Sequence, residues 1–138
     1  MKHRILIVDD EPQVRELLCL YLLRHGYDVS TAGSSVETLE LLKGNPVDVV
    51  VLDISLAQED GLKVLSMIKS EHPHLKVIML TGMGFVEDLL EEAQQKGADG
   101  YVSKALPLDE LLQAINRVLH SREEVKTSRT HKRVLAQH

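Results

Sequence analysis

Acidic side chains gather at one point near the start of the chain. The segment KHRILIVDDEP joins a run of apolar residues directly to Asp9, Asp10 and Glu11. Adjacent carboxylates repel each other, and each raises the free energy needed to ionise its neighbour. A bound cation would relieve that repulsion, so the cluster predicts a cation site if the fold brings further oxygen ligands to it.

Three more polar residues follow apolar runs later in the chain. Asp53 ends DVVVLD, Thr81 follows KVIML, and Lys104 follows GYVS. Each has an ordinary explanation when taken alone. Asp9 or Asp10 can cap a helix, Asp53 and Thr81 can serve as turn or cap residues, and Lys104 can be a solvated lysine. Their meaning depends on how the apolar runs are arranged.

The apolar runs alternate with segments of helical periodicity. Three of the runs are almost continuous in Val, Ile and Leu, which favours parallel strands that are covered on both faces. The predicted strands are 4–8, 27–32, 48–53, 76–80 and 100–103. The predicted helices run from Pro12 toward Gly26, from Ser34 or Ser35 to Gly44, from Gly61 to Ser70, from Phe85 to Lys96, and from about Pro107 onward.

This order of elements predicts an α/β fold with a doubly wound parallel sheet and helices on both faces. Parallel strands require right-handed crossovers, and ligands on such sheets bind at the carboxyl ends of the strands. The polar residues that follow the strands would therefore meet at one edge. Their joint position is much harder to explain by capping and turns than any single residue is.

Three carboxylates, a hydroxyl and an ammonium at one edge predict phosphoryl chemistry. Clustered carboxylate oxygens without nitrogen or sulfur ligands suit a hard cation, and Mg²⁺ fits best. Asp9 and Asp10 would hold the metal, which allows the anionic Asp53 to approach an anionic phosphoryl group. Thr81 and Lys104 would face that group, with the lysine neutralising its oxygens.

Other chemistries fit the sequence poorly. The chain has no Walker A motif, no G-x-G-x-x-G after the first strand and no G-x-S-x-G elbow. Cys19 is the only cysteine, which excludes an intramolecular disulfide and a cysteine-based zinc site. His72 and His74 flank Pro73 and give only a weak case for zinc. The net charge of −5 argues against nucleic-acid binding by the fold itself.

The chain resembles the receiver domains of two-component response regulators. The resemblance covers about residues 2–120 and rests on IVDDEP, on VVLDIS with Gly61 eight residues after Asp53, on MLTG, and on GYVSK followed by PLDELL. It implies a flavodoxin-like, five-stranded (βα)5 fold with strand order 2-1-3-4-5. It also implies a signalling phosphoacceptor that catalyses only its own phosphorylation and dephosphorylation.

The resemblance assigns a role to each matching residue. Asp53 would be the phosphoacceptor, and Mg²⁺ would be bound by Asp9, Asp10, Asp53 and the backbone carbonyl of Ser55. Lys104 would pair with the phosphoryl group and Thr81 would hydrogen-bond to it, while Tyr101 would turn inward as the switch aromatic. The donor would be a sensor histidine kinase or a histidine phosphotransfer protein. A homodimer is common in the family.

The sequence departs from the family pattern at two prolines. Ala57 stands four residues after Asp53 and Ala105 follows Lys104, where the family usually has proline. A receiver-like interaction or dimerisation module that works without phosphorylation is therefore an alternative. A metal-dependent phosphatase that uses Asp53 as its nucleophile is a weaker one, because Ser55 replaces the second acid that such enzymes commonly need.

The remaining expectations concern the chain as a whole. Residues 1–120 form the predicted receiver domain, and the basic, polar 121–138 is a tail or the start of a linker to an absent output domain that could bind DNA. We expect a cytoplasmic protein without membrane contacts. Within LLCLYLL (17–23) we expect Leu17, Leu18, Tyr21 and Leu22 to face the sheet together with Val14. Leu20 should then point outward, with Leu23 as a second candidate. These are either scattered surface leucines or a docking face for the kinase, and the family resemblance slightly favours the docking face.

Overall fold

The computed structural model describes residues 2–56, 58–82, 86–104 and 107–127, and it contains one five-stranded parallel sheet. The strands of this sheet are β1 (Arg4–Val8), β2 (Asp28–Ala32), β3 (Val49–Asp53), β6 (Lys76–Thr81) and β7 (Gly100–Ser103). Their order is β2-β1-β3-β6-β7, with every neighbouring pair parallel. Numbered within the sheet, this order is 2-1-3-4-5, so the predicted fold class is confirmed.

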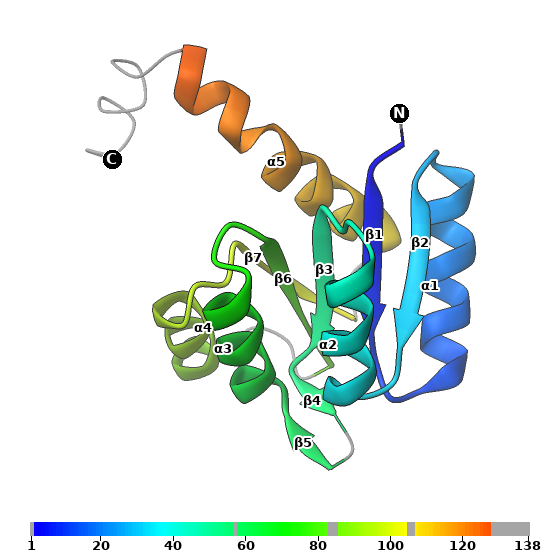
Figure 1. The fold of residues 1–138 in the computed structure, drawn as a ribbon, viewed down its shortest axis with the longest axis vertical. Helices are drawn as coiled ribbons and strands as arrows, with labels where there is room; N and C mark the ends of the chain where they lie inside the picture. Colours follow the sequence, from blue (N-terminus) through cyan, green and yellow to red (C-terminus); the bar gives the residue numbers. More distant parts are fainter. Residues whose placement is uncertain (1, 57, 83–85, 105–106, 128–138) are drawn as a thin grey trace.

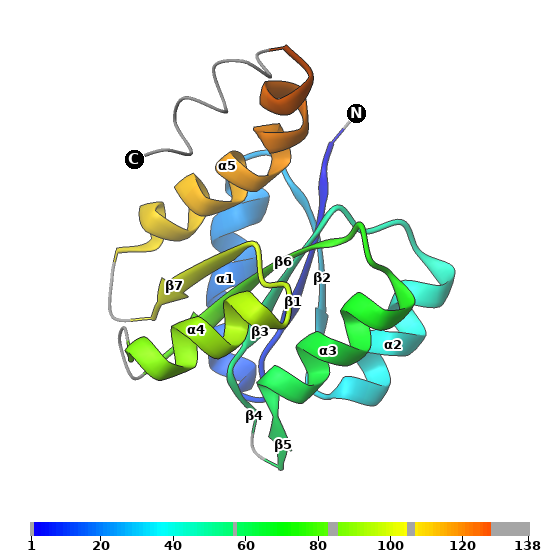
Figure 2. The same ribbon diagram turned by 90° about the vertical axis from the view of Figure 1, so that its left-hand side faces the viewer.

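Helices cover both faces of the sheet (Figures 1 and 2). The helices are α1 (Pro12–Arg24), α2 (Ser35–Gly44), α3 (Gly61–Glu71), α4 (Glu87–Gln95) and α5 (Leu108–Thr127). Helices α1 and α5 lie on one face, and α2, α3 and α4 lie on the other. Each face buries its own apolar cluster because successive strand residues point to opposite sides. In β1, for example, Leu6 belongs to one cluster and Ile7 to the other.

The central strands are buried throughout, as the continuous apolar runs predicted. All five residues of β3 are buried, and so are the last four of β1 and the last five of β6. Helix α1 ends where Gly26 adopts a φ of 91°, a left-handed conformation that costs glycine little. The Tyr27 amide then donates to the Leu22 carbonyl at 3.2 Å and turns the chain into β2.

The structure corrects the predicted orientation of one leucine in α1. Leu17 was expected to face the sheet, but 54% of its surface is exposed. Leu18 and Leu22 are buried, and Leu20 and Leu23 are exposed as expected, at 51% and 46%. Helix α1 therefore presents three leucines to solvent, because a helix that packs on one side of a sheet can bury only one stripe of a seven-residue apolar run.

Some expectations concern residues outside the described ranges. These include the family departures Ala57 and Ala105, the expected start of the fourth helix at Phe85, and residues 128–138 of the tail. Helix α4 begins at Glu87 within the described part. Helix α5 continues to Thr127, past the predicted domain boundary at residue 120. No helix in the described ranges is both long and apolar enough to cross a membrane.

The backbone after β3 has no room for a side chain at Gly61. A Cβ atom there would lie 2.3 Å from the Asp53 carbonyl oxygen and 2.6 Å from that of Ile54. We expect Gly61→Ala to lower the free energy of unfolding by about 2 kcal/mol or more, because backbone atoms must move to accept the methyl group. Urea denaturation measures the change.

Gly44→Ala is the matched control, because nothing lies within 4 Å of a Cβ atom at that position in α2. Its free energy of unfolding should stay the same or rise slightly, since alanine restricts the unfolded chain. Equal unfolding free energies for Gly61→Ala and the original protein would contradict the close backbone packing around Gly61.

Candidate phosphoryl and metal site

The register of the sheet brings the predicted site residues together. Val8 pairs with Leu52, which places Asp9 beside Asp53 at the next position. Thr81 pairs with Ser103 at the ends of β6 and β7, so Lys104 follows directly at the same edge. The Lys104 amide also donates to the Thr81 carbonyl at 2.7 Å. Four residues that are far apart in sequence thus share the carboxyl edge of the sheet.

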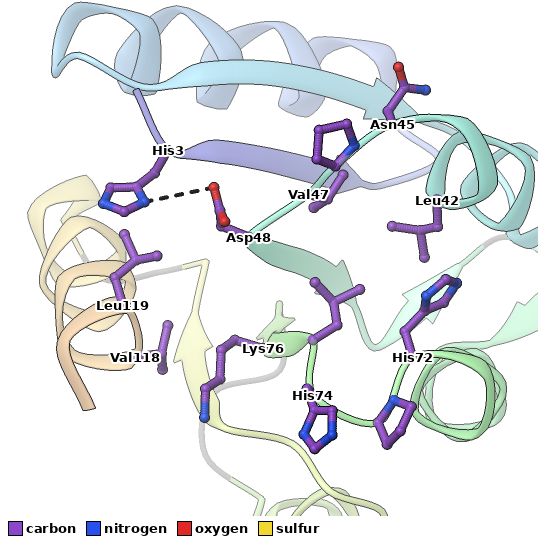
Figure 3. Close-up of a pocket in the computed structure, with 13 residues that line it drawn as sticks. His3, Leu42, Asn45, Val47, Asp48, His72, His74, Lys76, Val118 and Leu119 are labelled. Atoms are coloured by element: carbon purple, nitrogen blue, oxygen red, sulfur yellow. Dashed lines mark ion pairs between the residues drawn. The ribbon is translucent and has the colours of Figure 1, made fainter. Parts of the chain in front are cut away.

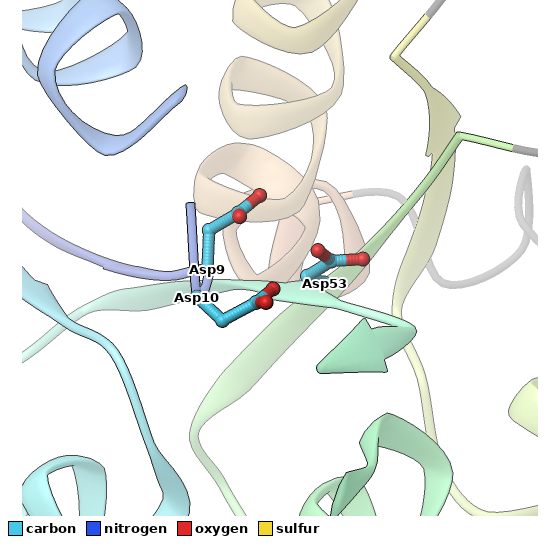
Figure 4. Close-up of side chains that lie close together, drawn as sticks. All are labelled: Asp9, Asp10 and Asp53. Carbon is cyan, nitrogen blue, oxygen red and sulfur yellow. The ribbon is translucent and has the colours of Figure 1, made fainter. Parts of the chain in front are cut away.

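Asp9, Asp10 and Asp53 form the one group of potential metal ligands in the described part of the chain. One ligand atom from each lies within 4.8 Å of the others (Figure 4). Asp9 and Asp53 are buried, with exposed fractions of 0% and 2%, and Asp10 is half-buried. Buried carboxylates require charge compensation, so this cluster is suited to a cation.

Lys104 supplies part of that compensation. Its Nζ lies 2.9 Å from Asp9 Oδ2 and 3.0 Å from Asp53 Oδ2, and it is 3.6 Å from Oε1 of the exposed Glu11. Burial alone would lower the pKa of Lys104, but the hydrogen bonds and charges of Asp9 and Asp53 outweigh burial and raise the pKa above its usual value. The ammonium therefore stays charged and bridges the two buried acids.

The second oxygen of each buried carboxylate is held by a backbone amide. Asp9 Oδ1 accepts from the Glu11 N–H at 2.9 Å, and Asp53 Oδ1 accepts from the Ser55 N–H at 3.0 Å. Glu11 occupies the N-cap position of α1, but its side chain makes no capping hydrogen bond. Glu11 therefore does not serve as a side-chain cap of α1, and Asp9 orders the turn before the helix in addition to contacting Lys104.

Burial and the surrounding charges set the proton affinity of Asp53. Desolvation raises its pKa most strongly, and the negative charge of Asp9 adds to this. The Ser55 amide and Lys104 act in the opposite direction, yet the net pKa lies above the ordinary value of 3.8. An ionised Asp53 is thus less favourable in this site than in water, as expected for a carboxylate that gains from a metal ion.

Two further contacts were not anticipated from the sequence. Arg15 Nη1 donates to the Asp9 carbonyl at 2.6 Å and so fixes the backbone between the two adjacent acids. Glu59, in the loop that follows Asp53, accepts a hydrogen bond from the Ser35 amide at the start of α2. Neither contact has a signal in local periodicity, because each joins separate elements.

A cavity lies at the opposite edge of the sheet from the carboxylate cluster. It measures about 560 Å³ and is lined by residues that include His3, Asp48, His72, His74 and Lys76. His3 Nδ1 lies 3.7 Å from Asp48 Oδ2, and the rings of His72 and His74 point away from each other (Figure 3). The zinc alternative thus gains no support from the described residues, where only the three aspartates form a metal-binding group.

Comparison with known proteins identifies the family. Residues 5–116 match the model of the response regulator receiver domain. The chain belongs to the response regulator receiver family. The resemblance found in the sequence is thereby confirmed, and the protein is a two-component signalling protein.

Curated relatives of this receiver domain are longer regulators. The chain is 35% identical over 115 residues to the probable transcriptional regulatory protein TcrX of Mycobacterium tuberculosis, covering 83% of this chain and 49% of TcrX. It is 36% identical over 122 residues to the transcriptional regulatory protein GlrR of Escherichia coli K12, covering 86% of this chain and 27% of GlrR. The chain thus spans half or less of the length of these relatives.

Solved receiver structures share the fold. A CheY-like receiver domain protein from Methanospirillum hungatei superposes with a TM-score of 0.83 at 28% identity, covering 90% of this chain and 98% of that one. The response regulator TrrA from Thermotoga maritima, solved in complex with Mg²⁺ and BeF, gives a TM-score of 0.76 at 36% identity, covering 86% of this chain and 100% of TrrA.

The raised pKa of Asp53 makes stability depend on pH. Protonated Asp53 favours the folded state below the unfolded pKa of 3.8, and this stability is lost as pH rises through the higher folded pKa. Without divalent cations, we expect Asp53→Asn to melt at a higher temperature than the original protein at pH 7. The difference should shrink as the pH falls below 3.8.

Thermal unfolding followed by circular dichroism at several pH values measures this effect. Asp109→Asn on the exposed first turn of α5 is the control, and it should change stability by less than about 0.5 kcal/mol. A lower melting temperature for Asp53→Asn at pH 7 would show that the Asp53 carboxylate stabilises the fold, which would contradict a raised pKa for that group.

Proposed function

We propose that this receiver domain accepts a phosphoryl group on Asp53 in a Mg²⁺-dependent reaction. The observation that carries the proposal is the bridge that Lys104 makes between Asp9 and Asp53 at the carboxyl edge of the sheet. It joins a buried acceptor carboxylate, a second buried acid and a permanent cation. These are the groups that phosphoryl transfer to a carboxylate requires.

Asp9, Asp10 and Asp53 would hold the Mg²⁺, together with the backbone carbonyl of Ser55. The donor set fits the ion, because three carboxylates with ligand atoms within 4.8 Å offer hard oxygen ligands and more negative charge than Lys104 neutralises. When bound, Mg²⁺ would neutralise charge on the phosphoryl oxygens and on Asp53. The choice of Mg²⁺ is supported by the structure of the related response regulator TrrA, which was solved in complex with Mg²⁺ and BeF.

Each residue then has a defined task in the transfer. An oxygen of Asp53 forms the new bond to phosphorus while the bond from phosphorus to the donor imidazole nitrogen breaks, and the imidazole leaves with the electron pair and takes up a proton. Lys104 shifts from the free carboxylate to a phosphoryl oxygen. The Ser55 amide keeps the other Asp53 oxygen oriented, and the buried Thr81 hydroxyl donates to the phosphoryl group.

Conformational switching would follow from these new bonds. Thr81 lies at the end of β6, and the half-buried Tyr101 lies in the neighbouring strand β7, where it packs against the apolar cluster of α2, α3 and α4. Movement of Thr81 toward the phosphoryl group leaves space that Tyr101 fills by turning inward. The two arrangements form a two-state equilibrium that phosphorylation shifts.

The partner we propose is a sensor histidine kinase or a histidine phosphotransfer protein in the cytoplasm. The domain acts as a signalling switch, and its only chemistry is its own phosphorylation and dephosphorylation. Homodimerisation and DNA binding by a separate output domain are further proposals. The relatives TcrX and GlrR, which are longer transcriptional regulatory proteins, support only the second of them. The alternative is a module that works without phosphorylation, and mapping of the acceptor residue distinguishes the two.

Chemical mapping of the acceptor tests the proposed function. After incubation with acetyl phosphate and Mg²⁺, borohydride reduction converts an aspartyl phosphate to homoserine, which peptide mass spectrometry locates. We expect homoserine at position 53 and none in Asp53→Asn, because Asp53 is the buried carboxylate at the end of β3 that we propose as the acceptor, and it contacts Lys104. Reduction at another aspartate would refute the assignment, and no reduction anywhere would favour the alternative module.

The exposed leucines of α1 predict a docking face for the donor. Leu20→Glu should leave the fold intact, since half of the side chain is already exposed, and should slow phosphotransfer from a cognate donor by roughly tenfold. Met67→Glu on α3 is the control, because Met67 is 41% exposed on the other face of the sheet. Transfer rates measured with radiolabelled donor would contradict this role if Leu20→Glu matched the original protein.

A further inference from the structure

The loop after Asp53 is folded as a small hairpin. Strands β4 (Ser55–Leu56) and β5 (Glu59–Asp60) pair antiparallel, with Ser55 opposite Asp60 and Leu56 opposite Glu59. The Gly61 amide donates to the Ile54 carbonyl at 3.0 Å and closes the base of the hairpin, and the Ile54 amide donates to the Leu80 carbonyl of β6 at 2.9 Å and fixes that base to the core. Asp60 Oδ1 also accepts from the Leu62 amide at 2.9 Å and caps α3.

The other side of the hairpin is fixed by Glu59 to a different helix. Glu59 Oε1 accepts from the backbone N–H of Ser35 at 2.9 Å, and Glu59 Oε2 accepts from the Ser35 hydroxyl. Ser35 is the first residue of α2 and is only 6% exposed. Its N–H has no acceptor within the helix, and a carboxylate at this position also interacts favourably with the helix dipole.

The pKa of Glu59 is consistent with its hydrogen bonds to Ser35. The two hydrogen bonds from Ser35 hold the pKa of Glu59 below its ordinary value, although partial burial acts the other way. Glu59 is therefore ionised whenever the site is in its working form near neutral pH. The carboxylate accepts from both hydrogen-bond donors of Ser35, which restricts the direction of the hairpin as well as its distance from α2.

The contact of Glu59 with Ser35 restrains the part of the hairpin that hydrogen-bonds to Asp53. Glu59 lies opposite Leu56, and Leu56 follows Ser55, whose N–H donates to Asp53 Oδ1 at 3.0 Å. A hairpin of two-residue strands has little stability of its own, so its position depends on its attachments. The amide that orients the Asp53 carboxylate is thus held from one side by the core and from the other by α2.

We propose that Glu59, through its contact with Ser35, is a positioning residue for phosphorylation of Asp53. By fixing the hairpin to α2, Glu59 holds the Ser55 amide against one carboxylate oxygen and keeps the Ser55 carbonyl at the metal site. The inference rests on the proposed function, and it adds a residue outside the acidic cluster that controls metal affinity and phosphorylation rate.

Four variants separate this role from a general effect on α2. Glu59→Ala removes both hydrogen bonds, whereas Glu59→Gln keeps a side-chain oxygen that can accept from Ser35. Ser35→Ala removes only the hydroxyl donor. Glu37→Gln is the matched control, because Glu37 accepts from the Gly33 amide at 3.1 Å near the same helix N-terminus and is exposed.

Three measurements report how each variant affects the Ser55 amide, Mg²⁺ binding and phosphorylation. NMR gives the hydrogen exchange rate of the Ser55 amide and the dissociation constant for Mg²⁺, and intact mass gives the rate of phosphorylation by acetyl phosphate. In Glu59→Ala we expect the Ser55 amide to exchange roughly tenfold faster. The dissociation constant for Mg²⁺ should rise and the phosphorylation rate should fall by a similar factor. Ser35→Ala should show a smaller change in the same direction, Glu59→Gln should recover part of the loss, and Glu37→Gln should match the original protein.

The proposal is overturned if Glu59→Ala folds and leaves the exchange rate and the Mg²⁺ constant unchanged. It is also overturned if Glu37→Gln causes the same loss, because the effect would then belong to the N-terminus of α2. If Glu59→Ala does not fold, Ser35→Ala decides by the same readings. A wild-type protein that is never phosphorylated would refute the proposed function, while amide exchange and Mg²⁺ titration would still test the hairpin.

Discussion

One ammonium group between two buried carboxylates is the interaction on which the site depends. Lys104 Nζ lies within 3.0 Å of an oxygen of Asp9 and of Asp53, and neither acid is exposed to water that could compensate its charge. Removal of carboxylates from water is costly, so the site is stable only because the lysine remains charged. With Asp10 nearby, the acids still outnumber the cation. That remaining negative charge is suited to a divalent metal, which in the proposed function would allow Asp53 to approach an anionic phosphoryl group.

Backbone geometry determines whether these charges can meet. The parallel register places the carboxyl ends of β1, β3, β6 and β7 at one edge, so Asp9, Asp53, Thr81 and Lys104 come together there. Close packing at Gly61 then forces the chain to turn sharply after β3, and the hairpin of β4 and β5 brings the Ser55 amide to Asp53. The loop after Asp53 is therefore constrained at both ends, which restricts the orientation of the Asp53 carboxylate.

The fold and the acidic cluster could be predicted from the sequence, because both leave strong local signals. Continuous apolar runs marked β1, β3 and β6, and the polar residues that end those strands marked the site. Other features have no such signal. A two-residue strand shows no periodicity, so the hairpin was missed, and the contact of Glu59 with Ser35 joins separate elements. The orientation of Leu17 was predicted wrongly because the seven-residue apolar run LLCLYLL contains no polar position to define the outward face.

The metal requirement of phosphorylation tests the central claim most directly. The protein is incubated with acetyl phosphate in Mg²⁺ or in EDTA, and its intact mass is recorded over time. Because excess negative charge around Lys104 must be neutralised before a phosphoryl group can approach, we expect an adduct of one phosphoryl group that forms in Mg²⁺ and is absent in EDTA. An adduct that forms equally fast in EDTA would contradict this expectation, since the lysine alone would then suffice.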